Sequence, residues 1–140
     1  MRQVGIGIAG FGTVGAGVYK HLSGNRELLC DRLGLELTVR RIALRDPNKP
    51  RPIQPPAEIV TTHWEDVVND PNVQIVVELM GGIEDPLKLV MAAIQKGKIV
   101  VTGNKALLAE HGKEIFRAAE QHRVHQQRKQ LMHRRPFLPS

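Results

Sequence analysis

One glycine motif governs the architecture expected of this 140-residue chain: Gly10-Phe11-Gly12-Thr13-Val14-Gly15. This G-x-G-x-x-G follows a strand-like segment, residues 3–9, and opens a helical pattern. In such a motif the first glycine permits a tight turn, the second lets the backbone approach a pyrophosphate, and the third lets helix and strand pack closely. The helix N-terminus then presents free N–H groups and a partial positive charge to phosphates. We interpret the motif as a dinucleotide-binding loop; a glycine turn without a ligand is the weaker alternative.

Strand-like and helical patterns alternate through the rest of the first 120 residues. Further strands are expected at residues 35–44, 59–61, 73–79 and 99–102. Helices are expected after Thr13, after a capping box that begins at Thr62, and after Asp85. Asn104 can cap a short helix to about residue 111, and one more helix is expected around residues 115–119. The alternation predicts an α/β fold, a Rossmann-type doubly wound parallel sheet with helices on both faces, over residues 1–120.

The last twenty residues differ in composition from this body. Most of the formal net charge of +6 lies in residues 117–140, which hold six basic residues and one acidic residue. Apolar periodicity ends after Ala119, and Pro136 and Pro139 interrupt the end of the chain. We therefore expect residues 121–140 to be a disordered basic tail. Basic tails can bind nucleic acid, but no aromatic residues are interleaved for base stacking, so a solvated tail is the favoured interpretation.

The composition excludes several classes of protein. Apolar residues make up 41% of the chain, which is enough for a core, and aromatic residues only 4%. No apolar run approaches the ~20 residues that cross a bilayer, and the first residues lack the layout of a signal peptide. Cys30 is the only cysteine, which we expect to be a small buried apolar residue. These features predict a cytoplasmic protein without a membrane partner.

The residues after the second strand bear on the choice of dinucleotide. A Rossmann site usually places an acidic residue there for the ribose hydroxyl, or arginine for a 2′-phosphate. This chain has both, in Arg45 and Asp46, although farther from Gly15 than the usual ~20 residues. Arg45 comes first and can make a bidentate phosphate contact. The sequence therefore favours NADP, with NAD still possible.

Other candidate residues fall at the carboxyl ends of later strands, where open α/β sheets bind ligands. They are Gly81, Gly82, Thr102 and Lys105. Lys105 opens a helix, where a cation opposes the dipole, and this suggests an anionic ligand nearby. Glu78, late in the third long strand, either faces the site or is a paired strand-end carboxylate, and we favour the second interpretation. No metal-ligand spacing is evident.

Together these segments resemble the cofactor domain of homoserine dehydrogenase. The resemblance is carried by residues 10–18, 76–82 and, most specifically, 97–109, and it covers about residues 3–120. It implies NAD(P)-dependent interconversion of L-homoserine and L-aspartate 4-semialdehyde, in threonine and methionine biosynthesis. It also implies that Phe11, Thr13 and Val14 contact the cofactor, that Arg45 meets the 2′-phosphate, and that Lys105 lies near the nicotinamide and takes part in binding and catalysis.

The resemblance stops short of a whole enzyme. From about residue 124 the sequence is basic, glutamine-rich and unlike the family, whose members continue into a substrate and dimerisation domain. The change indicates a shifted reading frame or a truncated gene product, so the chain is expected to lack the principal catalytic residues and to be inactive alone. A nucleotide-binding module without catalysis is the alternative function. Family members bind a small amino-acid substrate and form homo-oligomers.

Overall fold

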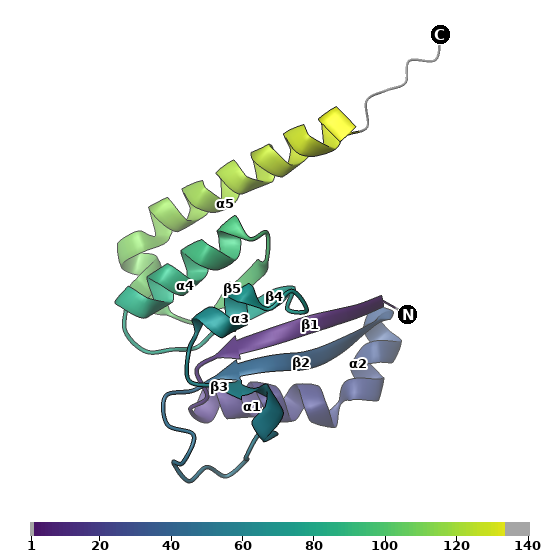
Figure 1. The fold of residues 1–140 in the computed structure, drawn as a ribbon, viewed down its shortest axis with the longest axis vertical. Helices are drawn as coiled ribbons and strands as arrows, with labels where there is room; N and C mark the ends of the chain where they lie inside the picture. Colours follow the sequence, from purple (N-terminus) through teal and green to yellow (C-terminus); the bar gives the residue numbers. More distant parts are fainter. Residues whose placement is uncertain (1, 134–140) are drawn as a thin grey trace.

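The computed structural model describes residues 2–133 and has a five-stranded parallel sheet at its centre (Figure 1). The spatial order of the strands is β3-β2-β1-β4-β5, and each neighbouring pair is parallel. The strands are β1 (Arg2–Ala9), β2 (Leu35–Ala43), β3 (Val60–Thr61), β4 (Ile75–Glu78) and β5 (Ile99–Thr102). All five expected strands are therefore present, and the predicted α/β class is confirmed.

Helices connect the strands in sequence. They are α1 (Thr13–Gly24), α2 (Arg26–Leu33), the 3-10 helix η1 (Ala57–Ile59), α3 (Glu65–Asn69), α4 (Glu84–Gln95) and α5 (Lys105–His133). Helix α1 starts directly at the glycine motif, as the sequence predicts. The left-handed Gly34 ends α2 just before β2 begins. Cys30, in α2, is half-buried and not fully buried as expected.

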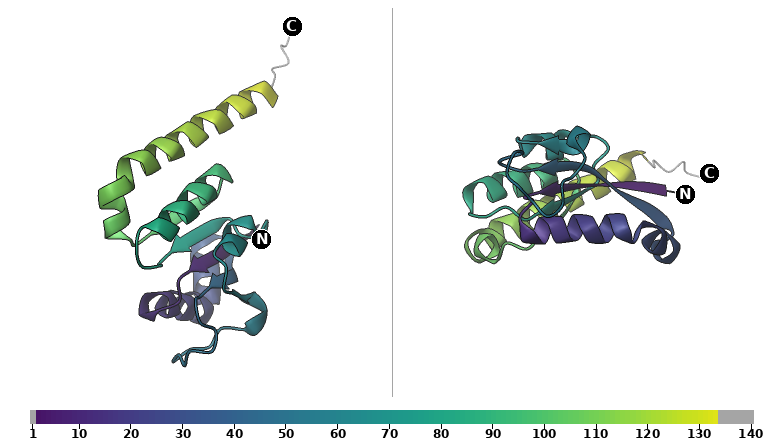
Figure 2. Two further views of the ribbon diagram at one scale, coloured as in Figure 1. Left: turned by 60° about the vertical axis from the view of Figure 1, so that its left-hand side comes forward. Right: turned by 90° about the horizontal axis from the view of Figure 1, so that it is seen from below.

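The two faces of the sheet carry different helices, because side chains alternate along a strand. Ile6 and Ile8 of β1 join a core cluster that packs against α1. Gly7 lies between them. A Cβ added there would project from the opposite face of the sheet and lie only 2.5 Å from Cγ1 of Val67 in α3. The second core cluster unites this face with α3 and α4. The view from below shows α1 on one side of the sheet and α3 on the other (Figure 2).

Two predicted helix starts have different outcomes. The cap at Asn104 is confirmed, because its Oδ1 accepts a hydrogen bond from the Leu107 N–H at 3.0 Å. The capping box at Thr62 is wrong, since α3 has no side-chain cap. Thr61 organises that turn instead: its hydroxyl donates to Asp66 Oδ2 at 2.5 Å and accepts from the His63 N–H at 3.1 Å. The threonine one position earlier thus orders the turn before α3 through groups other than those a capping box would use.

Residues 105–133 form one long helix, where the sequence indicates two short helices and then a tail. Gly112 does not interrupt it, and the helix changes direction after its first turns and then extends away from the sheet (Figure 2). Residues 121–133 are therefore helical, which corrects the expected disorder for that part. Glutamine, lysine and arginine favour helix, and extending an existing helix avoids the cost of nucleation. Residues 134–140 of the predicted tail lie outside the described residues.

Side chains of α5 pair with one another beyond its last core contacts. Arg123 donates to both carboxylate oxygens of Glu120, at 3.1 Å and 2.5 Å. This pairing holds the pKa of the Glu120 carboxyl below its usual value. From residue 125 to residue 130 every side chain is exposed. The end of the described helix is thus supported by local interactions and not by packing.

Lys98 ties the start of β5 to the loop before β4. Its Nζ donates to the carbonyl oxygens of Asp70 and Val73, at 2.9 Å and 2.5 Å. Burial lowers the pKa of the Lys98 ammonium, while the nearby Asp70 carboxylate opposes this shift.

Among the described residues, no helix is long and apolar enough to cross a membrane.

Candidate functional site

The glycine motif forms a turn that is locked by backbone contacts. Gly10 has a φ of +105°, and an added Cβ there would lie 2.6 Å from the carbonyl oxygen of Leu79. Its N–H donates to the Ala43 carbonyl at 2.9 Å, which joins the turn to the end of β2. A Cβ on Gly15 would come within 3.0 Å of the Gly10 carbonyl oxygen. Only glycine fits at both positions, so the start of α1 lies directly against the turn.

Gly12, between them, faces open space. It is the N-cap residue of α1, with an ordinary φ of −81°, and an added Cβ would meet no atom within 4 Å. No side chain caps the first turn of α1. The N–H groups of that turn are therefore available to a ligand, and they carry the partial positive charge of the helix N-terminus. An anionic group at this place would find donors already aligned.

This turn borders a cleft of about 700 Å³ at the carboxyl edge of the sheet. The loops after β1, β2, β3 and β4 all contribute to its walls. Its lining residues are Gly10, Phe11, Gly12, Thr13, Ala16, Gly17, Ala43, Leu44, Arg45, Asp46, Lys49, Pro50, Arg51, Pro52, Ile53, Thr62, Trp64, Leu79, Met80 and Asp85. The cleft thus runs from the phosphate-binding type of turn to the end of β2, as a dinucleotide site requires.

Three basic side chains line the end of this cleft that follows β2: Arg45, Lys49 and Arg51. The loop that carries them is ordered by its own hydrogen bonds. Asp46 Oδ1 accepts from the Asn48 N–H at 2.9 Å, and Arg51 Nη1 donates to the Lys49 carbonyl at 3.1 Å. Asp46 Oδ1 therefore shapes the turn, and the side chains of Arg45 and Asp46 are both exposed at the cleft.

The side chain of Phe11 is buried, and its ring packs edge-on against Tyr19 with ring centres 5.9 Å apart. Val14 is 63% exposed but does not line the cleft, and neither does the buried Gly15. Among the motif residues, the structure therefore brings together Gly10, Phe11, Gly12 and Thr13 at the cleft. Any contact from Phe11 comes mainly from its backbone.

The candidates beyond β4 and β5 lie along the same edge of the sheet but outside the lining of the cleft. They are Gly81, Gly82, Thr102 and Lys105. Two of the loops touch, because Asn104 Nδ2 donates to the Gly82 carbonyl at 2.7 Å. Glu78 is fully buried and hydrogen-bonded, so the paired strand-end interpretation of this carboxylate is confirmed. Lys105 is exposed at the first position of α5.

Sequence reasoning missed several lining residues. Lys49 and Arg51 were not predicted, although three basic residues within seven positions after a strand are a recognisable signal. Thr62 and Trp64 come from the loop after β3, and Asp85 lies in the first turn of α4. Nothing local in the sequence places those three beside the glycine turn, because the tertiary fold alone brings them there.

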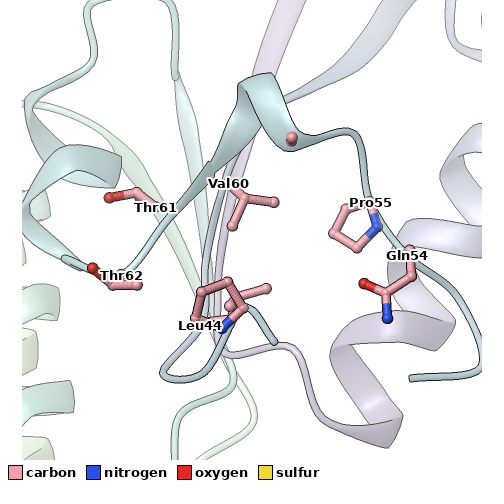
Figure 3. Close-up of a pocket in the computed structure, with 8 residues that line it drawn as sticks. Leu44, Gln54, Pro55, Val60, Thr61 and Thr62 are labelled. Carbon is pink, nitrogen blue, oxygen red and sulfur yellow. The ribbon is translucent and has the colours of Figure 1, made fainter. Parts of the chain in front are cut away.

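A second hollow of about 500 Å³ lies between β3 and the loop that precedes it (Figure 3). It shares Leu44 and Thr62 with the cleft. Its other lining residues are Pro47, Gln54, Pro55, Ala57, Val60 and Thr61. Since no lining side chain is charged, this hollow suits phosphates far less well than the cleft does. Among the described residues, no three His, Cys, Asp or Glu side chains are grouped to hold a metal ion.

Comparisons with known proteins agree with this geometry. Residues 10–127 match a family model described as the NAD-binding domain of homoserine dehydrogenase. A homoserine dehydrogenase of Synechocystis is 42% identical over 127 residues, which is 87% of this chain and 28% of that protein. A homoserine dehydrogenase of Bacillus subtilis is 35% identical over 121 residues, again 28% of its length. The chain therefore spans little more than a quarter of these relatives.

Solved structures of similar proteins share the fold. The crystal structure of a homoserine dehydrogenase from Thiobacillus denitrificans has a TM-score of 0.80 and 44% identity, and the match covers 87% of this chain and 28% of that one. A hyperthermophilic archaeal homoserine dehydrogenase in complex with NADPH has a TM-score of 0.67 at 22% identity. That match covers 86% of this chain and 42% of the archaeal one, and it shows a common fold.

Proposed function

This chain belongs to the homoserine dehydrogenase family, and on that premise we propose that it is the part of such an enzyme that holds NADP(H). The observation that supports this most directly is the cleft beside an uncapped helix N-terminus, with the open position at Gly12. When bound, the nicotinamide supplies hydride transfer, between L-homoserine and L-aspartate 4-semialdehyde in this family's reaction. The chain's own residues bind the cofactor and orient it.

The residues present fit a dinucleotide. A Cβ-free surface at Gly12 lets a pyrophosphate reach the N–H groups of the first turn of α1, beside Thr13. Gly10 and Gly15 fix the turn that presents these groups. In an open α/β sheet the ligand crosses the point where the strand order reverses, which here lies between β1 and β4.

We assign the adenosine end to the loop after β2, where Arg45, Lys49 and Arg51 gather. A guanidinium can bind a 2′-phosphate with two parallel hydrogen bonds, and two further cations strengthen the attraction. Asp46 uses Oδ1 in its turn and can still accept a ribose hydroxyl at Oδ2, so the preference rests on the three cations. The proposal is therefore NADP in preference to NAD.

The opposite end of the dinucleotide then extends over β4 and β5, toward Gly81, Gly82, Thr102 and Lys105. We propose that Lys105 contributes binding and catalysis there, since its ammonium opens a helix and gains from an anionic partner. The chain covers 28% of the Synechocystis relative, so the amino-acid substrate pocket and any homo-oligomer contacts are assigned to the remainder of such a protein. The 140 residues alone are expected to bind cofactor and to show little turnover.

Titration of the chain with NADPH and with NADH, followed by nicotinamide fluorescence, tests the cofactor assignment. Arg45→Ala should weaken NADPH binding about 10- to 100-fold, the loss of a charge-assisted hydrogen bond, and change NADH binding less than about twofold. Arg117→Ala, an exposed arginine on α5 outside the cleft, is the matched control and should leave both affinities unchanged. Equal losses for NADH and NADPH, or none for NADPH, would remove Arg45 from the 2′-phosphate site.

A nucleotide-binding module without catalysis is the second candidate function. The observation that favours it is that the cleft is lined by the glycine turn and the basic loop after β2, while Lys105 lies outside its lining. It predicts NADPH binding with no homoserine-dependent reduction of NADP under any condition. Turnover near that of a full-length family member would reject it.

A further inference from the structure

We propose that Glu78 is a positioning residue, whose buried carboxylate joins the loops after β4 and β5 and fixes the part of the site that receives the nicotinamide end of the cofactor. This inference rests on the proposed function and deepens it. It concerns a ring of hydrogen bonds on the side of the site away from Arg45. Three side chains and three backbone groups form the ring, and Lys105 follows it directly in sequence.

The carboxylate of Glu78 holds both loops by direct contacts. Glu78 is the last residue of β4, and its side chain is completely buried. Oε2 accepts a hydrogen bond from the Met80 N–H at 2.8 Å, in the loop after β4. Oε1 accepts from the Thr102 hydroxyl at 2.5 Å, at the end of β5. A buried carboxylate is costly without such partners, so the loops and the carboxylate depend on one another.

Thr102 passes this constraint to the start of α5. Its Oγ1 donates to Glu78 and accepts from the Asn104 N–H at 3.0 Å. Asn104 then makes two further bonds: Nδ2 donates to the Gly82 carbonyl at 2.7 Å, and Oδ1 accepts from the Leu107 N–H at 3.0 Å. The path thus returns from β5 to the loop after β4 and closes the ring. The next residue after Asn104 is Lys105, the first of α5.

The ring acts on one end of the site only. Arg45 follows β2, whereas Glu78 and Thr102 end β4 and β5, and β1 lies between the two groups in the sheet. A dinucleotide whose adenosine end lies over β2, with its pyrophosphate at α1, has its nicotinamide end over β4 and β5. Loss of the ring should therefore weaken contacts of the nicotinamide end and spare those of the adenosine end.

The direction of the hydrogen bonds makes the ring testable by small changes. A carboxylate accepts at both oxygens, but a glutamine at position 78 offers one accepting oxygen and one NH₂ donor. If the NH₂ faces the loop after β4, the Met80 N–H loses its acceptor; if it faces β5, the Thr102 hydroxyl must accept instead of donate. The side-chain volume is almost unchanged. Thr102→Val removes the hydroxyl at constant shape, and Thr102→Ser keeps it.

The experiment measures two ligands on each variant by titration calorimetry. NADPH carries both ends, and adenosine 2′,5′-bisphosphate carries only the adenosine end with its 2′-phosphate. Glu78→Gln and Thr102→Val should each weaken NADPH binding about tenfold and change bisphosphate binding less than about twofold. Thr102→Ser should bind both ligands as the unchanged chain does. Glu84→Gln, an exposed glutamate at the start of α4, is the matched control and should have no effect.

Nicotinamide fluorescence gives a readout that a general loss of stability would not produce. Saturated with NADPH, Glu78→Gln should give a lower fluorescence anisotropy than the unchanged chain, because the nicotinamide end is held less firmly. Should Glu78→Gln not fold, the pair Thr102→Val and Thr102→Ser carries the same comparison.

The outcomes separate this inference from the proposed function. Equal losses for NADPH and the bisphosphate, or unchanged NADPH affinity in Glu78→Gln and Thr102→Val, overturn the positioning role and leave the cofactor proposal standing. An unchanged chain that binds neither ligand overturns the proposed function and the inference together.

Discussion

Replacement of glycine by alanine should affect stability and cofactor binding differently at three positions in the segment that connects β1 to β2. At Gly15 the new methyl group would come within 3.0 Å of the Gly10 carbonyl oxygen and 3.1 Å from its carbonyl carbon. Both are backbone atoms of the turn, so α1 must move by about 1 Å to reach ordinary contact. Overpacking of this kind costs about 1–3 kcal/mol of unfolding free energy, which lowers Tm by roughly 4–12 °C.

At Gly12 the methyl group would enter the cleft and touch no protein atom within 4 Å. Since φ is −81°, alanine fits without strain, and the stability should change by less than about 0.5 kcal/mol. Cofactor affinity should nevertheless fall at least about tenfold, because a pyrophosphate could no longer approach the backbone. Gly24→Ala is the control, since its Cβ also meets open space but at the far end of α1. It should raise the stability by about 0.5–1 kcal/mol.

Thermal unfolding followed by circular dichroism, with and without NADPH, measures both quantities in one experiment. Ligand at 100 times its Kd should stabilise the unchanged chain and Gly24→Ala by about 2.7 kcal/mol. Gly12→Ala should unfold at the unchanged temperature without ligand and lose about half of the ligand-induced shift if its affinity falls tenfold, and more if it falls further. The reasoning fails if Gly15→Ala is as stable as the unchanged chain, or if Gly12→Ala keeps the full shift.

Three further results are expected. Trp64 is the only tryptophan and lines the cleft, so NADPH should quench its emission, and a Trp64→Phe variant should still bind NADPH in calorimetry without that signal. Lys98→Met should lose about 1–3 kcal/mol in urea unfolding, because two backbone carbonyls lose their donor; an unchanged midpoint would contradict this. The lowered pKa of Glu120 predicts that its pair with Arg123 stabilises α5 above the usual glutamate pKa and is lost as pH falls through the lowered value. A carboxyl titration of Glu120 by NMR that matches a free glutamate would refute it.

The sheet could be predicted from the sequence because each strand has a local signature. The apolar runs at residues 3–9 and 73–79 and the glycine motif between strand and helix required no knowledge of tertiary contacts. The later part of α5, residues 121–133, could not be predicted in this way, because few apolar residues mark it. Residues 121–133 have high helix propensity but nothing to bury, and periodicity arguments detect burial and not propensity.

The capping error at Thr62 has a related cause. Two adjacent threonines precede α3, and the motif spacing to Glu65 selects the second. In the structure Thr61 is buried at the end of β3, where its hydroxyl reaches Asp66, while Thr62 is exposed at the cleft. Pairing of β3 with β2 sets which threonine faces inward, and that pairing is not visible in a four-residue pattern.

The two halves of the candidate site differ in what makes them rigid. This difference explains why only one half could be predicted from the sequence. In the first half, at the glycine turn, the constraint is steric. Backbone atoms lie so close to Gly10 and Gly15 that a side chain is excluded, and the glycine motif is therefore visible in the sequence. At the second half the constraint is a set of directed hydrogen bonds through Glu78, Thr102 and Asn104, residues that lie up to 26 positions apart. Each is an ordinary polar residue by itself, and its partners exist only once β4 and β5 are paired. Steric rules therefore indicate the proposed phosphate site from the sequence alone, whereas the groups that we propose orient the reactive end are recognised only in the tertiary structure.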